Sequence, residues 1–319
     1  MHSSYDNSAA LVVLPPVSGG RLQDKSLRAW LARADLMMAP EPRDLLSRIT
    51  AALGLPYGHE GLAALRMWGQ TGDRPTVWIA GADPVYLEPR LDTLYLHALR
   101  RDGVPPADLR ALFDHLQSTL ADDTGFGFAR LGASGYLRAE EPIATAAVPA
   151  YVIDGQRPGD YLPQGNDVAT HRRLQSEVEM ALHDHDVNQR RVAAGQHPIN
   201  SLWFWGGGLA PKRERQPQPP LFSNEPLLLG YWESALADSE LWPGSIAACL
   251  DSAAGGFVAV TPRSESDPAF LADSLSELRA AVSSGRLDRL ILLFRDGLRA
   301  DIAASQRFRF WRRDSGLLT

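Results

Sequence analysis

The chain has 319 residues, of which 45% are hydrophobic and 22% charged, and its formal net charge is −6 at pH 7. This composition is that of a globular protein with a large core, and the negative charge argues against a general nucleic-acid-binding surface. Because Cys249 is the only cysteine, an intrachain disulfide is excluded. No apolar run reaches the roughly 18 residues of a membrane span, and the polar stretch Met1–Ala10 lacks a signal-peptide pattern. We therefore expect a cytoplasmic protein without a nucleic-acid or membrane partner.

Short apolar runs alternate with helical patterns over the first third of the chain. The spacing predicts strands at 11–14, 76–80, 85–87 and 94–96, and helices at 26–35 and 42–53. Gly54 stands where a helix C-cap belongs. Asp83 follows the strand at 76–80 and Gly81, so we predict that its carboxylate lies at a strand end. There it would either start a turn before Pro84 or serve a site.

The alternation continues to the end of the chain. The patterns predict helices at 105–120, 167–183 and 187–194, a hairpin of 126–130 with 136–138, and a strand at 148–153. A strand–helix–strand unit follows at 257–261, 268–283 and 287–294, and a late strand at 308–311. Such a unit favours a parallel pair of strands joined by a right-handed crossover.

This order of elements indicates the fold class. Strands that alternate with helices predict an α/β protein with a mostly parallel sheet and helices on both faces. The hairpin region predicts a small antiparallel excursion from that sheet. We expect a single α/β domain over residues 1–319, with residues 85–145 as an α+β subdomain within it.

The most informative stretch is 199–208, Ile-Asn-Ser-Leu-Trp-Phe-Trp-Gly-Gly-Gly. Its apolar and aromatic positions predict a buried strand, and the glycines at 206–208 predict a sharp loop at its end. Loops at the carboxyl edge of an α/β sheet commonly bind ligands. The glycine N–H groups could hold an anion together with Lys212 or Arg213, beside Trp205 as a wall. The alternative is a tight turn that only packs the strand end.

Histidine and carboxylate clusters give a weaker signal. His183 and His185 stand two residues apart, beside Asp186, and side chains two apart on a helix point to different sides. No histidine occurs beyond His197, which counts against a histidine-rich two-metal centre. We therefore predict no metal site, and no cofactor unless the chain is an enzyme that uses a divalent metal. Cys249 lies in an apolar helical context that predicts a buried, inert thiol.

The segment 209–226 is long and rich in proline, and it carries Lys212 and Arg213. These features predict an exposed loop. A loop of this length is typically functional or mobile, so it is a candidate surface for a protein partner.

One resemblance rests on residues in the middle of the chain. They are His185-Asp186-Val187-Asn188, then Arg191, Gly195, Pro198 and Asn200, and finally Leu202-Trp203-Phe204-Trp205-Gly206-Gly207-Gly208. This pattern resembles a bacterial family described as regulatory protein of pathogenicity factors, type E, whose members are phosphoglycerate-mutase-like. The segment Ala82-Asp83-Pro84-Val85 and a C-terminal strand near Trp311 are compatible with that family. The stretch is also similar to the archaeal-type cofactor-independent phosphoglycerate mutases of the alkaline-phosphatase superfamily.

The resemblance implies an alkaline-phosphatase-like core, and the departures from it limit what else it implies. A mutase of that type would carry a metal-binding aspartate at the end of its first strand, where this chain has Pro15-Pro16. It would also carry aspartate and histidine ligands in its C-terminal part, where this chain has no histidine. The resemblance therefore implies a related sheet without the two-metal chemistry.

We predict a regulatory or small-anion-binding protein with a degenerate phosphoglycerate-mutase-like core and a phosphorylated small molecule as its ligand. The candidate anion-binding residues are Asn188, Arg191, Asn200, Trp205, Gly206, Gly207, Gly208 and Lys212, with Asp83 and His185 as secondary candidates. One alternative is an active phosphoryl-transfer enzyme, either a mutase-like isomerase or a phosphatase, in which Asp83, His183, His185 and Asp186 supply acid–base or metal-binding groups. The other alternative is a protein-interaction module that binds through 209–226. The sequence leaves catalytic residues unidentified.

Overall fold

The computed structural model describes residues 9–39, 43–99, 103–121, 125–164, 168–253, 255–263, 268–303 and 305–306. Contacts within the chain divide it into two compact units, one formed by residues 1–56 with 213–319 and the other by residues 57–212. The second unit is therefore an insertion into the first. The subdomain expected at 85–145 lies inside this second unit, whose bounds are wider.

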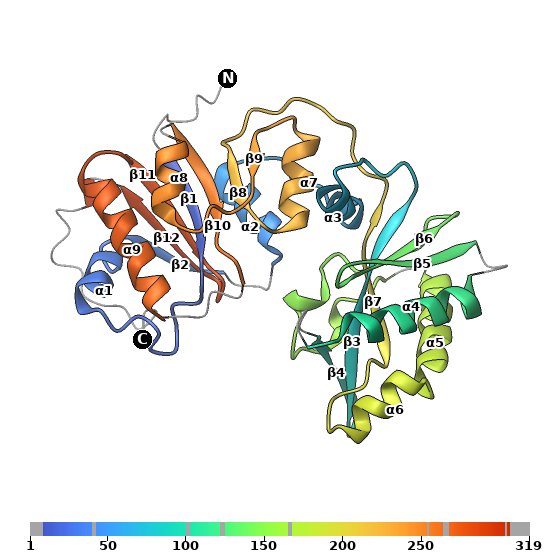
Figure 1. Ribbon diagram of the computed structural model, residues 1–319. Helices are drawn as coiled ribbons and strands as arrows, with labels where there is room; N and C mark the ends of the chain where they lie inside the picture. The colour runs from blue at the N-terminus through green and yellow to red at the C-terminus, as the bar shows by residue number, and fades with distance from the viewer. Residues whose placement is uncertain are drawn as a thin grey trace. The chain divides into compact units, whose positions relative to one another are not determined.

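The first unit is built on a seven-stranded sheet, sheet A, in the order β2-β12-β11-β1-β10-β8-β9 (Figure 1). Its strands are β1 (Ala9–Leu14), β2 (Asp35–Met38), β8 (Leu221–Ser223), β9 (Ser239–Glu240), β10 (Gly256–Val260), β11 (Arg289–Phe294) and β12 (Leu298–Ala303). The run from β11 to β9 is parallel, and β12 and β2 are antiparallel to their neighbours. The predicted α/β class with a mostly parallel sheet is confirmed.

Helices cover both faces of sheet A. They are α1 (Lys25–Leu31), α2 (Leu45–Leu53), α7 (Pro226–Ser234), α8 (Ile246–Ser252) and α9 (Pro268–Ser283). Apolar side chains of α1, α8 and α9 form one core with alternate residues of β1, β10, β11 and β12. Helix α2 contacts β11, and α7 contacts β8 and lies beside it in Figure 1. No helix in the described ranges is long and apolar enough to cross a membrane.

The centre of sheet A follows directly from its sequence. Strand β1 reads as an unbroken apolar run because helices bury both of its faces, and five of its six residues are buried. The predicted unit β10-α9-β11 is present, and its two strands are parallel. They do not pair with each other, because β1 lies between them and bonds to both.

The second unit contains a five-stranded sheet, sheet B, in which β4-β3-β6-β5 are neighbours and β7 pairs with β3. The elements are α3 (Leu62–Thr71), β3 (Ile79–Arg90), β4 (Thr93–Ala98), α4 (Pro106–Leu120), β5 (Phe126–Leu131), β6 (Ser134–Ala139), two 3-10 helices (Ala150–Val152 and Pro158–Asp160), α5 (Ala169–His183), α6 (Asp186–Ala193) and β7 (Ser201–Gly208). Every pair in sheet B is antiparallel. This is the antiparallel excursion that the hairpin pattern predicts.

Helices pack against sheet B as well. Side chains of α4, α5 and α6 pack on one face of the sheet in a second core. Helix α3 contacts β3 and β7, and its residues are absent from that core. Strand β7, which carries the predicted glycine motif, is therefore covered along almost its whole length.

Four local predictions are wrong. The segment predicted as an exposed loop at 209–226 contains the buried strand β8 and ends on the first residue of α7. The strands predicted at 76–80 and 85–87 are one strand, β3, so Asp83 lies in mid-strand and not at a strand end. The run predicted as a strand at 148–153 contains a 3-10 helix, Ala150–Val152, which begins directly after Pro149. The glycines at 206–208 belong to β7 and do not form a loop. The strand predicted at 308–311 lies outside the described residues.

Candidate functional site

The glycines at 206–208 are required by close packing. A Cβ atom on Gly207 would lie 2.5 Å from Trp78 Cζ2, and one on Gly208 would lie 2.4 Å from the Gly61 nitrogen. Their backbone donors have protein partners: Gly206 N–H donates to the Ala146 carbonyl at 2.8 Å, and Gly207 N–H donates to Thr145 Oγ1 at 3.0 Å. The N–H groups that we expected to hold an anion are thus bonded within the unit.

Trp205 and Asp83 belong to one buried network. Trp205 is 1% exposed, and its Nε1 donates to Asp83 Oδ2 at 2.7 Å. Asp83 Oδ1 accepts from Arg66 Nη1 at 2.6 Å. The indole lies across Gly81, where a Cβ atom would come within 2.3 Å of Nε1. Trp205 is therefore a packed core residue and not the predicted wall of a ligand site.

Arg66 is the centre of that network. It also donates to the Tyr136 hydroxyl and the Gly135 carbonyl, and its guanidinium lies 4.5 Å from the Tyr136 ring centroid and 4.9 Å from that of Trp205. Burial alone would lower the pKa of Arg66, but the charge of Asp83 and the Tyr136 hydroxyl raise it. Arg66 of α3 is thus bonded to β3 through Asp83 and to β6 through Gly135 and Tyr136.

The predicted polar residues near β7 also bond to the backbone. Asn188 bridges two segments: its side chain donates to the carbonyls of Leu182 and Ile199 and accepts from Ile199 N–H. Arg191 donates to the His197 carbonyl at 2.9 Å. The Asn200 amide makes the corresponding pair of bonds to the Leu87 backbone. Asn188 and Arg191 are buried, at 3% and 5% exposure, so the structure places them in positions that support the chain.

The residues before α6 have separate roles. His185 is the N-cap of α6, and its Nδ1 accepts from Val187 N–H at 3.2 Å. Burial, followed by the neighbouring His115, lowers the pKa of His185. His183 is exposed and its Nε2 lies 3.9 Å from Asp184 Oδ1, as expected for a solvated helix end. Lys212 is exposed in a segment without helix or strand, and Asp186 begins α6.

The structure thus spreads the predicted residues over β3, α6, β7 and the following segment. Across the described ranges, no group of three or more His, Cys, Asp or Glu side chains is placed to hold a metal ion. The predicted burial of Cys249 is confirmed, and burial raises the pKa of its thiol to about 12.

A different group of charged residues lies at the carboxyl edge of sheet A. We call it the edge cluster, and it consists of Arg48, Glu225, Arg263, Arg295 and Asp296. Glu225 follows β8, Arg263 follows β10, and Arg295 and Asp296 follow β11 directly. The carboxyl ends of parallel strands are where open α/β sheets bind ligands.

Glu225 joins two arginines of the edge cluster. Its Oε1 accepts from Arg263 Nε at 2.9 Å and lies 3.6 Å from Arg295 Nη2. Arg295 also donates to the Thr261 carbonyl at 2.6 Å, which fixes it against the end of β10. The side chain of Arg295 is 15% exposed, whereas that of Arg263 is 42% exposed. One guanidinium is anchored, and the other faces solvent.

Asp296 and Arg48 are the remaining residues of the edge cluster. Its Oδ2 accepts from the N–H groups of Val17 and Ser18, each at 2.8 Å, so it holds the turn that follows β1. Arg48 donates to the carbonyls of Phe294 and Leu298. Burial lowers the pKa of Arg48, and the charge of Asp296 opposes that shift. Three arginines therefore face two carboxylates at this edge.

Comparisons with known proteins connect the chain to one group of enzymes. It is 43% identical over 68 residues to the 2,3-bisphosphoglycerate-independent phosphoglycerate mutase of Methanosarcina acetivorans, an overlap of 21% of this chain and 17% of the relative. It is 30% identical over 107 residues to that of Methanosarcina barkeri, an overlap of 33% and 27%. Each overlap spans less than a third of the relative's length. No family model matches the chain.

The chain is a distant homologue of the cofactor-independent phosphoglycerate mutases. Two solved structures are also similar to it. The cofactor-independent phosphoglycerate mutase from Thermoplasma acidophilum aligns with 92% of this chain and 89% of its own at 16% identity and a TM-score of 0.41. The PH0037 protein from Pyrococcus horikoshii aligns with 98% and 92% at 11% identity and a TM-score of 0.46.

In this phosphoglycerate-mutase-like chain the edge cluster does not fit a two-metal centre. Of its two carboxylates, Glu225 is engaged by arginines and Asp296 by backbone N–H groups. Arginine is instead suited to phosphate and carboxylate, which its planar fork binds with two parallel hydrogen bonds. Sequence reasoning missed this cluster, although Arg263 and Arg295 each stand within three residues of a predicted strand's end.

Proposed function

We propose that this phosphoglycerate-mutase-like protein is a cytoplasmic regulatory protein, of the type E family that its motif resembles, and that it binds a small phosphorylated anion at the edge cluster. The observation that carries the proposal is the meeting of Arg48, Arg263 and Arg295 at the carboxyl edge of sheet A. Within the cluster the guanidinium of Arg263 is the exposed one, so we expect it to be the first contact of the anion.

The chemistry of arginine supports a phosphorylated ligand. Charge-assisted bonds between guanidinium and phosphate are about twice as strong as neutral hydrogen bonds. Arg295 is already oriented by the Thr261 carbonyl, so little side-chain entropy is lost when an anion binds it. The names of the relatives make phosphoglycerate the natural first probe.

The test measures binding of 3-phosphoglycerate and of inorganic phosphate by calorimetry and by thermal unfolding. Arg263→Gln removes the exposed guanidinium, and Arg289→Gln at the opposite end of β11 is the matched control for charge. We expect the wild type and Arg289→Gln to bind and Arg263→Gln to bind at least tenfold more weakly. At a ligand concentration of 100 times Kd, stabilisation of the wild type should reach about 2.7 kcal/mol. Equal affinity in Arg263→Gln would overturn the edge cluster as the site.

The enzyme alternative has its own measurement. Phosphorus NMR follows 3-phosphoglycerate, with and without manganese, for isomerisation or for release of phosphate. A regulatory protein leaves the substrate unchanged in both conditions. Turnover that survives repeated purification and disappears in an edge-cluster variant would replace the regulatory proposal with an enzymatic one.

A further inference from the structure

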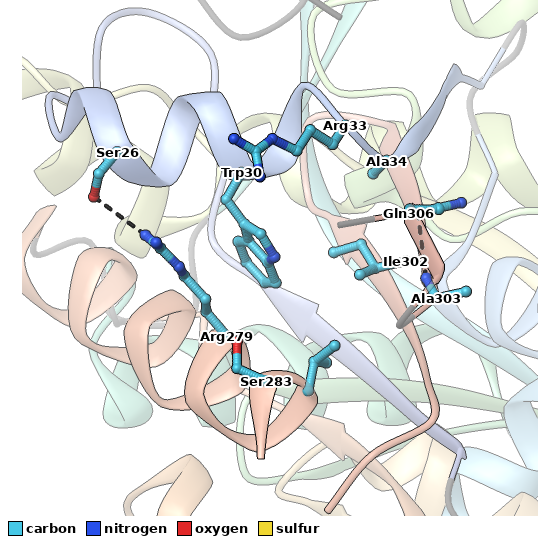
Figure 2. Close-up of a pocket in the computed structure, with 10 residues that line it drawn as sticks. Ser26, Trp30, Arg33, Ala34, Arg279, Ser283, Ile302, Ala303 and Gln306 are labelled. Atoms are coloured by element: carbon cyan, nitrogen blue, oxygen red, sulfur yellow. Dashed lines mark hydrogen bonds between the residues drawn. The ribbon is translucent and has the colours of Figure 1, made fainter. Parts of the chain in front are cut away.

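The first unit contains a cavity of about 200 Å³ between α1, α9 and the end of β12 (Figure 2). Trp30 of α1 points into it, and Arg279 of α9 lines it together with Ser26 (Figure 2). Arg279 is engaged within the protein, since it donates to Ser26 Oγ at 3.3 Å and interacts with the charge of Asp24. We therefore infer no ligand for this cavity.

Two histidine rings of the second unit lie together where α4, α5 and α6 meet, and we call them the histidine pair. The ring centroids of His115, in α4, and His185, at the start of α6, are 4.9 Å apart. His115 Nε2 donates to the carbonyl of Ala181, in α5, at 3.1 Å. His185 Nδ1 accepts from Val187 N–H at 3.2 Å and so caps α6. The histidine pair therefore links α4 to the last turn of α5 and to the first turn of α6.

The N-cap bond requires a neutral His185 ring. Because Nδ1 accepts the bond from Val187 N–H, the proton of the neutral ring is on Nε2. A second proton would sit on Nδ1, where it would face the Val187 N–H, and the cap would be lost. The positive charge would also lie at the N-terminus of a helix, where the backbone dipoles disfavour a cation. Protonation of His185 and capping of α6 therefore exclude each other.

Charged and titratable groups of the two neighbouring helices surround His185. From α4 they are His115 and Asp108, and from α6 they are Asp186 and Arg190. Asp108 is paired with Arg190 at 3.0 Å. Burial of the ring is the largest cause that lowers the pKa of His185, and His115 and Arg190 lower it further, whereas Asp186 and Asp108 oppose the shift. The closed arrangement thus disfavours a proton on His185.

Helix α6 buries little apolar surface. Of its eight residues, the buried ones are Val187, Asn188 and Arg191, of which Val187 alone is apolar. An element with few buried apolar contacts opens at a lower free energy than the core of a domain. The same helix holds the chain that enters β7, because Asn188 bonds both backbone groups of Ile199 and Arg191 donates to the His197 carbonyl.

We propose that the histidine pair is a pH-sensitive switch on α6: in acid, a proton on His185 releases the first turn of α6 and the segment 197–199 that enters β7, while sheet B stays folded. The open form binds a proton that the closed form disfavours, so its population rises as the pH falls below the ordinary histidine pKa of 6.5. Above that pH the ring is neutral in both forms and the switch is closed. This device is independent of the edge cluster and of the function proposed for it.

The experiment measures hydrogen exchange of the full chain by mass spectrometry at about pH 7.5 and about pH 5.5, with rates corrected for the intrinsic effect of pH. In the wild type, peptides that cover 186–193 and 197–200 should lose protection by about five- to tenfold at the lower pH, because one pH unit below 6.5 changes the proton linkage by about a factor of ten. Peptides of β3 should keep their protection.

Three variants separate the switch from general acid sensitivity. His185→Asn keeps a side-chain acceptor for Val187 N–H and does not titrate, so α6 should keep the wild-type protection of pH 7.5 at both pH values. His115→Gln removes the like charge beside His185 and should reduce the pH dependence. His183→Asn is the matched control, because His183 is exposed beside Asp184 at the end of α5, and it should leave the pH dependence unchanged.

The proposal is overturned if wild-type α6 has the same protection at both pH values, or if His185→Asn loses as much protection in acid as the wild type. A loss of protection that spreads equally over β3 would show global unfolding and would overturn the switch as well.

Discussion

Two arginines, one in each unit, show that the same residue type occurs in two different settings. One is buried in a network of protein contacts, and the other is exposed at the edge of a sheet. Arg66 in the second unit has a side chain 8% exposed, an ion pair with Asp83, hydrogen bonds to Tyr136 and Gly135, and two aromatic rings against its plane. Arg263 in the first unit is 42% exposed and pairs with Glu225 at the carboxyl edge of a parallel sheet. The first is fixed by its surroundings, and the second faces solvent.

The difference teaches that exposure, and not the residue type, separates a scaffold residue from a candidate for ligand binding. The motif around β7 has arginine, asparagine, tryptophan and glycine in a pattern that suggests ligand binding. The bonds given above for Asn188, Arg191, Asn200 and Trp205 all go to protein atoms. The edge cluster has no such sequence pattern, yet it brings charged groups together at a solvent-facing edge.

The largest effect should come from Asp83→Ala, which tests the scaffold side of the comparison. The substitution leaves the Arg66 guanidinium buried without its ion pair, which should cost about 3–5 kcal/mol of unfolding free energy. Urea denaturation measures the loss. As the control, Glu88→Ala removes the partly exposed pair with Arg90 and His97 and should cost below about 1 kcal/mol. Equal losses in the two variants would contradict the assigned role of Asp83.

A smaller but clear loss is expected for Gly207→Ala. The added Cβ atom would meet Trp78 at 2.5 Å and Thr145 at 3.0 Å, so neighbouring side chains must shift at a cost of about 1–3 kcal/mol. Gly159→Ala is the matched control, since nothing lies within 4 Å of the Cβ position there. If Gly207→Ala is as stable as the wild type but loses anion binding, the motif is a site and the comparison fails.

The dependence of stability on pH should be smaller still. Burial lowers the pKa of both His171 and His185 in the folded chain from the ordinary value of 6.5. The unfolded chain therefore binds protons first as the pH falls, and stability declines below about pH 6.5 by at most about 1.4 kcal/mol per pH unit for each histidine. Above that pH the two groups contribute no slope.

The histidine at the helix cap can be separated from the other by substitution. His185→Asn keeps a side-chain oxygen that can cap α6 and removes the titrating ring. Urea denaturation at several pH values should show a shallower slope below pH 6.5 in this variant. A slope identical to that of the wild type would mean that His185 is not coupled to folding.

The smallest change in stability is predicted for Arg263→Gln. Its ion pair with Glu225 is partly exposed, and exposed pairs contribute about 0–1 kcal/mol. The same substitution should nevertheless abolish most of the stabilisation by phosphate. A variant that keeps its fold but loses phosphate binding would behave in the opposite way to Asp83→Ala, which is expected to lose stability. A large loss of stability in Arg263→Gln would instead show that Arg263, like Arg66, is a structural residue.

The sequence by itself determined the α/β class, the central strands of sheet A and the helices from α4 to α6. These elements have strong periodic patterns, or continuous apolar runs such as β1, and local physics decides them. The glycine-capped end of α2 and the hairpin of β5 with β6 were also readable, because each depends on residues close in the chain.

Only the tertiary structure decided where those elements meet. Pairing of β3 with β7 places Trp205 across Gly81 and its indole nitrogen on Asp83, which turns a presumed binding motif into a core. The edge cluster gathers residues from 48 to 296. No periodicity along one segment encodes such distant neighbours, because their proximity depends on the strand order of the sheet.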